Sequence, residues 1–421
     1  MLLKGNTFVA GSQWGDESKG KIADCLAAEA DIVARAQGGP NAGHTVWIGE
    51  KKYVFHLLPC GILHDHCVNI VGNGVVIGVE GIVHEIESLQ ERGWRVDGKN
   101  LLISDRAHLI LPRHLAADNA NEDSEGNKLG TTRRGVGPAY SDKAARISAM
   151  RMCDLMEFDL FREKYARICD MSDIPEEEMN ATLDAYADHA EFLRPHVTDT
   201  TAVLHDALEA GKRIVFEGAQ GTLLDIDFGT YPYVTSSSTT AGGVCTGLGI
   251  PPSAVQETMA VVKAYTTRVG LGPFPSEMDD VFGAKVREAG DEYGATTGRP
   301  RRCGWLDMVG LRYSSRINGF TQLAVSKMDV LDGLETLRIC VGYRRNGEAV
   351  DRFPALLSVL EECEPVYEEM PGWSEDTSAV REYDQLPANA RAYLERIEAL
   401  LDTPVTCVSV GKERSATMAR M

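Results

Sequence analysis

The stretch GSQWGDESKGKI, residues 11–22, decides how the rest of the chain is interpreted. It nearly matches the phosphate-binding pattern G-x-x-x-x-G-K-[ST], but Ile22 stands where a Ser or Thr normally helps to hold Mg²⁺. Asp16 and Glu17 place two carboxylates where an anionic phosphate is expected. Because phosphate repels a carboxylate unless a cation lies between them, we expect Mg²⁺ to bridge Asp16 and the phosphates.

The surroundings of this loop have the order strand, glycine-rich loop, helix that a phosphate site requires. An apolar strand precedes residue 11, and residues 19–30 carry Ile22, Leu26 and Ala30 at helical spacing. Backbone N–H groups at a helix N-terminus bind anions, and two lysines add positive charge. We therefore expect the phosphates to be bound by Gly15, Glu17, Ser18, Lys19, Gly20 and Lys21.

Composition narrows the class of protein. The chain has 421 residues and a formal net charge of −19, which argues against a nucleic-acid-binding or membrane-binding surface. No apolar run reaches the roughly 18 residues of a membrane span, and the N-terminus does not resemble a secretory signal. The ten cysteines form no C-x-x-C pair, as expected for reduced thiols. These features predict a cytoplasmic protein without nucleic-acid or membrane partners.

Strands and helices alternate along the chain, which predicts an α/β fold with a mostly parallel central sheet and helices on both faces. Residues from about 118 to 199 are more polar and helical, and we interpret them as a helical insertion within a single domain, residues 1–421. Ligands bind at the carboxyl ends of parallel strands. The loops after Ala10, Ala36, Phe216, Val325 and Val410 should therefore converge.

Two further motifs carry chemistry. In GGPNAGHT, residues 38–45, His44 follows a flexible glycine loop and is a candidate acid or electrostatic stabiliser. In VSKMD, residues 325–329, the carboxylate of Asp329 can accept the N1–H and 2-amino groups of guanine while the stem of Lys327 lies along the ring. Adenine offers neither donor in that arrangement, so the pair favours a guanine nucleotide.

The remaining motifs predict a second nucleotide site and a site for a small acid. GATTGRPRRCGW, residues 294–305, carries arginines in a flexible loop, which suits a dicarboxylate or a phosphate. Residues 130–146 combine threonines, arginines and glycines that could hold a second phosphate. Residues 216–243 offer Gln220 and a Thr/Ser-rich run as neutral partners for a purine and its ribose phosphate.

The motifs QWGDESKGK, QGGPNAGHT, TTRRGVGPAY, FEGAQGTLLDIDFGTYPYVTSS, TTGRPRRCGWLD and SKMDVLDG occur in this order, and with them the chain resembles the adenylosuccinate synthetase family. The resemblance extends from about Asn6 to Met418. It implies a P-loop-like α/β fold, a homodimer, and a ligase that makes adenylosuccinate from IMP and L-aspartate while GTP becomes GDP and phosphate.

The resemblance also implies residue roles. Asp16 would remove the N1 proton of IMP and bind Mg²⁺, His44 would stabilise the transferred phosphoryl group, and the carbonyl of Gly43 would be a second metal ligand. The GTP contacts would be the phosphate loop together with Gly43, Thr45, Lys327, Asp329, Ser409 and Gly411. IMP would be bound by Asp16, Lys19, Asn41, Thr132, Gln220, Thr235, Val269, Arg299 and, from the other subunit of the dimer, Arg146. L-Aspartate would be bound by Thr297, Arg299 and Arg301.

Three positions depart from the pattern usual in the family. Ser18 replaces a glycine, which would cost on the order of 1 kcal/mol if the backbone there has positive φ. Phe228 and Ser238 stand where His and Asn are common, near the expected IMP pocket. These departures leave open a paralogue that aminates GMP or dGMP, and a GTP-binding switch that has lost catalysis. The arginine loop and Gln220 argue against a switch.

Overall fold

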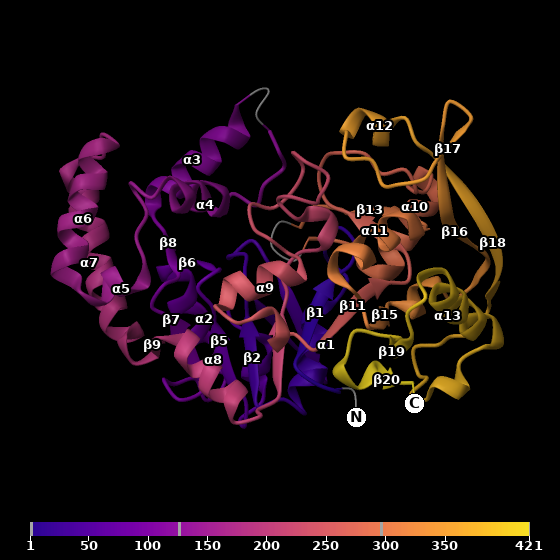
Figure 1. The fold of residues 1–421 in the computed structure, drawn as a ribbon, viewed down its shortest axis with the longest axis horizontal. Helices are drawn as coiled ribbons and strands as arrows, with labels where there is room; N and C mark the ends of the chain where they lie inside the picture. The colour runs from indigo at the N-terminus through magenta and orange to yellow at the C-terminus, as the bar shows by residue number, and fades with distance from the viewer. Residues whose placement is uncertain (1–2, 125–127, 295–297, 421) are drawn as a thin grey trace.

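A ten-stranded sheet forms the centre of the computed structural model, which describes residues 3–124, 128–294 and 298–420 (Figure 1). Nine neighbouring strands run parallel, and the terminal strand β20 is antiparallel. The strand order is β20 (Thr417–Ala419), β19 (Val405–Ser409), β15 (Gln322–Ser326), β11 (Glu257–Lys263), β1 (Thr7–Gly11), β10 (Ile214–Glu217), β2 (Ile32–Arg35), β5 (Val68–Val71), β7 (Leu101–Ser104) and β9 (Val197–Thr198).

Side chains of the strands point alternately to the two faces of this sheet, and both faces are buried. Val9 of β1 packs with Ile22 of α1 (Lys19–Ala27) on one face. Phe8 belongs to a larger cluster on the other face. That cluster is covered by α8 (Thr200–Glu209), α9 (Ala241–Leu248), α11 (Met308–Asn318) and α13 (Ala388–Leu401). The predicted α/β fold, with a mostly parallel sheet covered on both sides, is confirmed.

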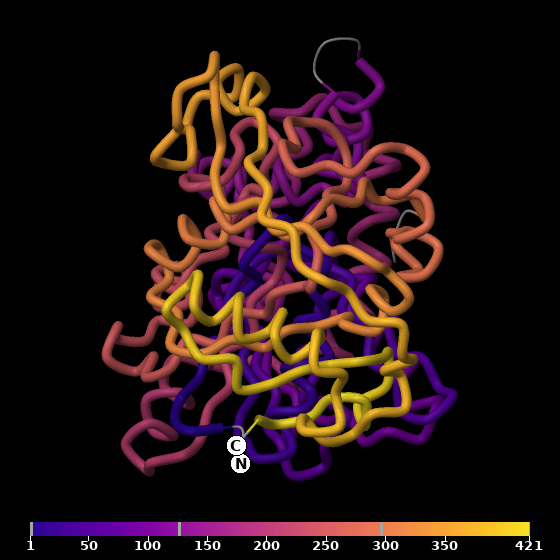
Figure 2. The backbone as a smooth tube through the Cα atoms, turned by 90° about the vertical axis from the view of Figure 1, so that its right-hand side faces the viewer, coloured from indigo at the N-terminus to yellow at the C-terminus, as the bar shows by residue number. Residues whose placement is uncertain are grey.

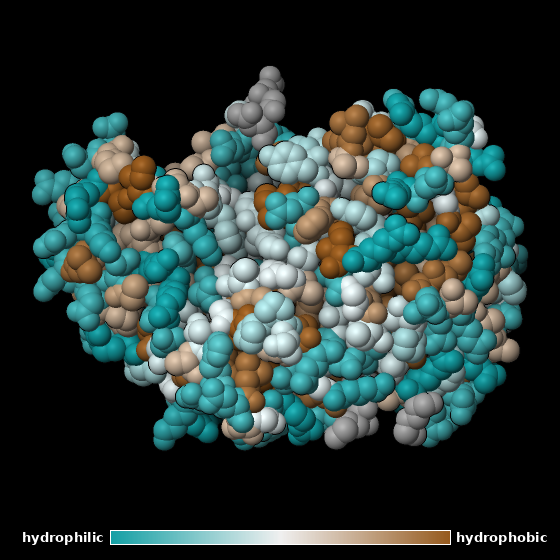
Figure 3. Space-filling model, viewed as in Figure 1, coloured by the Kyte–Doolittle hydropathy of each residue, from teal (hydrophilic) through white to brown (hydrophobic). Residues whose placement is uncertain are grey.

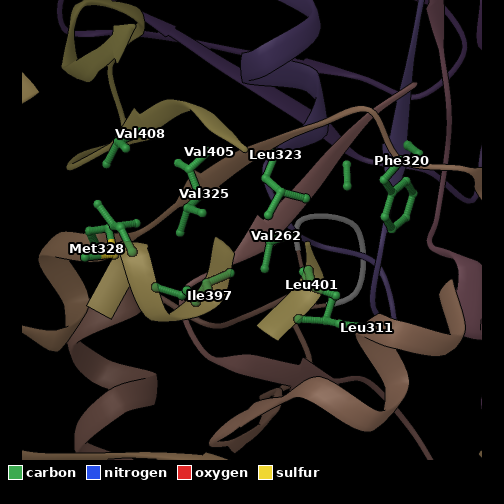
Figure 4. Close-up of a cluster of buried hydrophobic side chains, with 14 of the residues drawn as sticks. Val262, Leu311, Phe320, Leu323, Val325, Met328, Ile397, Leu401, Val405 and Val408 are labelled. Carbon is green, nitrogen blue, oxygen red and sulfur yellow. The ribbon is translucent and has the colours of Figure 1, made fainter. Parts of the chain in front are cut away.

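Figure 4 shows part of the larger cluster, where side chains from two helices face the strands. Leu311 comes from α11 and Ile397 from α13, and both lie close to the strand residues. Leu323 of β15 is fully buried there. Packing of this kind fixes α11 against the sheet, and α11 also contacts the loops described below.

The helical segment lies at the β9 end of the sheet, on the left in Figure 1. Its helices are α3 (Pro112–Asp123), α4 (Val136–Ala145), α5 (Met152–Met156), α6 (Phe158–Met171) and α7 (Glu176–Leu193). Of these, α5, α6 and α7 share a core with α2 (Val79–Glu91). The predicted insertion also contains β9, which pairs with β7 as the edge strand of the sheet. Two residues are too few to show a strand period in the sequence. The assignment of the whole chain to one domain stays a prediction.

A second, antiparallel sheet was not expected from the motifs. β16 (Leu334–Arg345) pairs with β18 (Glu364–Trp373) and β17 (Glu348–Val350), and in parallel with β14 (Leu306–Asp307). The short helix α12 (Leu357–Glu361) lies between β17 and β18 in the chain. Figure 2 shows this C-terminal part, orange to yellow, forming one side of the molecule. In the central sheet, β19 is followed by the antiparallel edge strand β20.

Among the described residues, no helix combines the length and apolar character that crossing a bilayer requires.

Truncation of Leu323 tests the central packing. We expect Leu323→Ala to lower the free energy of unfolding by about 2–5 kcal/mol, because a fully buried side chain leaves a cavity. Met171→Ala, at a side chain that is 63% exposed, should change it by less than about 0.5 kcal/mol. Urea denaturation followed by circular dichroism measures both, and equal losses would show that β15 is not central to stability.

Candidate active site

Five loops meet at one edge of the central sheet. The strands that precede them, β19, β15, β1, β10 and β2, all run in the same direction. Residues at or near their carboxyl ends lie in register, for example Val9 with Glu217 and Glu217 with Arg35. The predicted convergence of the loops is therefore confirmed.

The two acids of the phosphate loop have different environments. Glu17 is fully buried, and its Oε1 accepts hydrogen bonds from the backbone N–H groups of Gln13 (2.9 Å) and Gly15 (3.0 Å). Its Oε2 accepts a hydrogen bond from Nζ of Lys19 at 2.5 Å. The Glu17 side chain thus holds the loop from inside, and its negative charge is balanced there. Only the backbone of Glu17 is left for the predicted phosphate contact.

Asp16 is the acid that remains accessible. Its side chain is 35% exposed, and Oδ2 forms an ion pair with Nε of Arg301 at 2.9 Å. The backbone at Asp16 has φ 60°, and the preceding Gly15 has φ 84°. This conformation, unusual for a non-glycine residue, turns the carboxylate out of the loop.

His44 begins β3 (His44–Ile48), and its Nδ1 forms a hydrogen bond with Oε1 of Glu217 at the end of β10. The other oxygen of Glu217 accepts the backbone N–H of Cys60 at 2.8 Å. Both His44 and Glu217 are buried. A side chain on Gly20 would collide with His44, since its Cβ would lie 2.6 Å from that of His44. His44 therefore lies directly against the first turn of α1.

The charges of this pair follow from its burial. Burial would raise the pKa of Glu217, but the hydrogen bond and the charge of His44, with help from Cys60 N–H and Arg35, bring the pKa below its ordinary value. Burial lowers the pKa of His44, and Glu217 opposes that shift. An ionised Glu217 fixes the proton on Nδ1 and so orients the ring. Glu217 was missed in the sequence analysis, although it ends a strand inside the quoted motif FEGAQG.

A second buried carboxylate, Glu292, joins two of the predicted ligand sites. Oε1 accepts hydrogen bonds from Lys327 (2.8 Å) and Lys263 (2.9 Å), and Oε2 from Nη1 of Arg301 (2.6 Å). Burial would raise the pKa of Glu292, but the charges of Lys263, Lys327 and Arg301 bring the pKa well below its ordinary value. A chain of charged contacts therefore runs from Lys327, predicted to contact guanine, through Glu292 and Arg301 to Asp16.

The predicted guanine pocket contains a carboxylate oxygen without a partner. Within the described residues, Oδ1 of Asp329 is buried and accepts no hydrogen bond. Nearby, Nζ of Lys21 donates to Ser409 Oγ (2.5 Å) and to Gly411 O (2.6 Å). Burial lowers the pKa of Lys21 to about 8. The side chain of Lys21 therefore reaches the guanine side of the site, whereas Lys19 stays in the phosphate loop.

Three of the predicted IMP residues form one hydrogen-bonded chain. Gln220 donates from Nε2 to Asn41 Oδ1 at 3.2 Å, and Asn41 donates from Nδ2 to Thr235 Oγ1 at 3.3 Å. Gln37, which was not predicted, donates to Gln220 Oε1 at 3.2 Å. A Cβ on Gly11 would lie 2.2 Å from Gln220 O and 2.9 Å from Lys19 Nζ. The hydrogen-bonded row of side chains that includes Gln220 therefore lies next to the phosphate loop.

The other predicted IMP and aspartate residues come from three loops. Arg299 donates to Gly130 O at 3.4 Å, and a Cβ on Gly130 would lie 3.7 Å from Gly270 Cα. The loops that carry Arg299, Thr132 and Val269 are therefore neighbours. Thr297 lies outside the described residues. Arg146 ends α4 in an exposed position with φ 68°.

The two departures near the IMP pocket have different surroundings. Ser238 donates to Asp225 Oδ2 at 3.3 Å, which also accepts the N–H of Thr239 at 2.5 Å. Phe228 is 44% exposed, and its hydrogen bonds are made by the backbone: its N–H donates to Asp225 Oδ1 at 3.1 Å, and its oxygen accepts from the hydroxyl of Tyr313 at 2.9 Å. The hydroxyl of Ser238 is thus part of the loop scaffold, while the ring of Phe228 is free to contact solvent or a ligand.

Ser18 has φ 71° and ψ 31°, so the residue that replaces glycine is in the left-handed region. We expect Ser18→Gly to raise the free energy of unfolding by up to about 1 kcal/mol, because glycine adopts this conformation without steric cost. Ser18→Ala is the matched control, since alanine bears the same cost as serine. Thermal unfolding compares the two variants, and an equal gain with alanine would rule out the backbone explanation.

Comparisons with known proteins identify the family. The sequence model of the family described as adenylosuccinate synthetase matches residues 8–418. Adenylosuccinate synthetases of Carboxydothermus hydrogenoformans and Brevibacillus brevis are 52% and 51% identical, and in each pair 97% of both chains is covered.

Two solved structures resemble the fold. The fully ligated adenylosuccinate synthetase of Plasmodium falciparum has a TM-score of 0.95 and 42% identity, with 99% of this chain and all of that chain covered. The succinoaminodeoxyadenylate synthetase of cyanophage S-2L, bound to dGMP and dATP, has a TM-score of 0.64, 20% identity, and coverage of 99% and 95%. The second likeness concerns the fold alone. By its sequence over nearly the whole length and by its fold, the chain belongs to the adenylosuccinate synthetase family.

Proposed function

We propose that the protein joins L-aspartate to IMP at the expense of GTP, giving adenylosuccinate, GDP and phosphate. The observation that carries this proposal is the position of Asp16. It keeps an accessible carboxylate in the phosphate loop, while Glu17 is buried and neutralised. The hydrogen-bonded chain around Gln220, the unpartnered oxygen of Asp329 and the arginine loop supply pockets for the three substrates.

The reaction proceeds in two steps. Asp16 takes the proton from N1 of IMP, and O6 attacks the γ-phosphorus of GTP, so that the bond to the β–γ bridging oxygen breaks and GDP leaves. The Nε2 side of His44, oriented by Glu217, stabilises the charge on the transferred phosphoryl group. The amino group of aspartate then attacks C6 of 6-phosphoryl-IMP, and inorganic phosphate leaves.

Mg²⁺ fits the donor set of this site. The carboxylate of Asp16 and the backbone carbonyl of Gly43 are hard oxygen donors, which Mg²⁺ prefers. When bound, the ion would neutralise phosphate charge beside Asp16. The ligand atoms of His44, Cys60 and Glu217 also lie within 4.8 Å of one another, but nitrogen and sulfur donors suit softer metals.

A homodimer would complete the IMP site. Arg146 is exposed on α4 and, within the described residues, has no ion-pair or side-chain hydrogen-bond partner. We propose that it contacts the IMP phosphate in the other subunit. The free cysteines are consistent with a reducing compartment, and we place the reaction in the cytoplasm.

Release of GDP tests the function directly. We expect turnover only when IMP, L-aspartate and GTP are all present, and none when GMP or dGMP replaces IMP. Asp16→Asn should abolish turnover while equilibrium dialysis still detects IMP binding, because the amide cannot accept the N1 proton. Turnover on GMP or dGMP would instead indicate a paralogue, and GTP binding without any turnover would indicate a switch.

Asp329→Asn tests the guanine assignment. We expect the KM for GTP to rise about 10- to 100-fold, because an amide cannot accept both guanine N–H groups and leaves a buried donor unpaired. Xanthosine triphosphate is the matched ligand, since its 2-oxo group accepts from the new amide and should recover part of the loss. An unchanged KM for GTP would show that Asp329 does not read the base.

Glu217→Gln tests the orientation of His44. We expect kcat to fall about 10- to 1,000-fold with little change in the KM for IMP or GTP, because general acid catalysis depends on the correct tautomer. Glu217 raises the pKa of His44, so its loss should lower that pKa and move the alkaline limb of the pH–kcat profile to lower pH. A variant with normal kcat and an unmoved profile would remove Glu217 from the mechanism.

A further inference from the structure

A cavity of about 660 Å³ lies beside α11, between that helix and the antiparallel sheet of β16, β17 and β18. This volume is within the range of small-molecule sites. None of the residues that we assign to GTP, IMP, aspartate or Mg²⁺ lines it. In Figure 3, apolar brown side chains are exposed over α12 and along the neighbouring strands on this side of the molecule. Among the described residues, the cavity therefore shares no lining residue with the proposed active site.

The walls of the cavity are strongly basic. Arg312, Arg316, Arg344 and Arg352 line it, against a single carboxylate, Asp351. Within the described part of the chain, Arg316, Arg344 and Arg352 form no side-chain hydrogen bond or ion pair, and Asp351 pairs with none of them. Such a cluster is unexpected on a chain with a net charge of −19. Guanidinium groups that converge without carboxylates are suited to phosphate.

Arg312 shows that part of this basic wall is preformed. Its Nε donates to Leu400 O at 3.2 Å, and its Nη1 donates to Val341 O at 2.9 Å. Two backbone oxygens thus fix the guanidinium of Arg312 beside α11, and its remaining N–H groups have no hydrogen-bond partner among the residues that the structure describes. Less side-chain entropy is lost when an anion binds to a group that is already held.

The same cavity has an aromatic wall. The rings of Tyr313 and Phe353 are stacked, with centroids 5.0 Å apart and an interplanar angle of 19°. Tyr343 is buried beside them. Aromatic faces bind planar rings such as nucleobases, and a stacked pair presents a rigid platform. Basic and aromatic walls together suit a ligand with a ring at one end and several negative charges at the other.

We propose that this cavity binds a small aromatic polyanion with the chemistry of a nucleotide, whose phosphates contact the arginines while its base packs against the Tyr313–Phe353 pair. The ligand would contact the helix that supports the active-site loops. In α11, Ser314 donates to Ser12 O at 2.7 Å and Tyr313 to Phe228 O at 2.9 Å. The site is thus a third nucleotide site, distinct from the two that the ligase reaction uses.

ATP is the probe of choice, because adenine lacks the donors that Asp329 accepts in guanine. Isothermal titration calorimetry would use the full chain with GDP and IMP at saturating concentrations and without aspartate. We expect one further ATP to bind per chain, and inorganic triphosphate and adenosine to bind more weakly than ATP. Absence of ATP binding under these conditions would overturn the proposal, and equal affinity for triphosphate would overturn the aromatic half of it.

Two neighbouring arginines supply a matched pair of variants. Arg344→Gln should weaken ATP binding about tenfold or more, because it removes a charge-assisted contact to phosphate. Arg345→Gln should leave ATP affinity unchanged, since Arg345 does not line the cavity and is paired with Glu362 at 2.6 Å. Equal weakening in both variants would show only a general charge effect and would overturn the site. GDP and IMP affinities, measured in parallel, should stay the same in both.

Discussion

One buried carboxylate, Glu292, holds the substrate-facing side chains of this ligase in a common framework. An ionised carboxylate in a protein interior is stable only when cations and hydrogen bonds compensate it. Lys263, Lys327 and Arg301 do so here, and Arg301 also pairs with Asp16. The side chains that we propose for guanine recognition, aspartate binding and catalysis are therefore positioned by the same charge. A change in any one cation leaves the others around an undercompensated anion, so these sites are not independent of one another.

Buried carboxylates with hydrogen-bonded partners also occur in and beside the phosphate loop. Glu17 is paired with Lys19 and accepts hydrogen bonds from backbone N–H groups, and Glu217 forms hydrogen bonds with His44 and with the N–H of Cys60. Each of these carboxylates is fully buried, and each serves to place another group. Asp16 differs from both because it stays accessible to solvent and substrate. Burial thus separates Glu17 and Glu217 from Asp16, the acid for which we propose the catalytic role.

Backbone strain is also concentrated at this site. Asp16, Ser18, Gln220 and Lys327 all have positive φ, between 58° and 71°, although none is glycine. Such conformations are retained where the surrounding packing determines them, and they direct side chains that a regular loop would point elsewhere. The contacts of α11 with Ser12 and with the backbone of Phe228 contribute to that packing. The cavity therefore lies beside α11, the helix that contacts these strained loops.

Residues 11–22 were enough to predict the strand–loop–helix unit, and the six motifs were enough to predict the family and its ligands, because loop conformation and ligand chemistry depend on residues close together in the chain. The parallel sheet followed from the alternation of strands and helices. Glu217, Glu292 and the antiparallel sheet of β16 to β18 were not predictable in this way. A buried glutamate looks like any other glutamate until partners such as Lys263 and Arg301 are brought to it. Those contacts join distant segments, and so only the folded chain decides them.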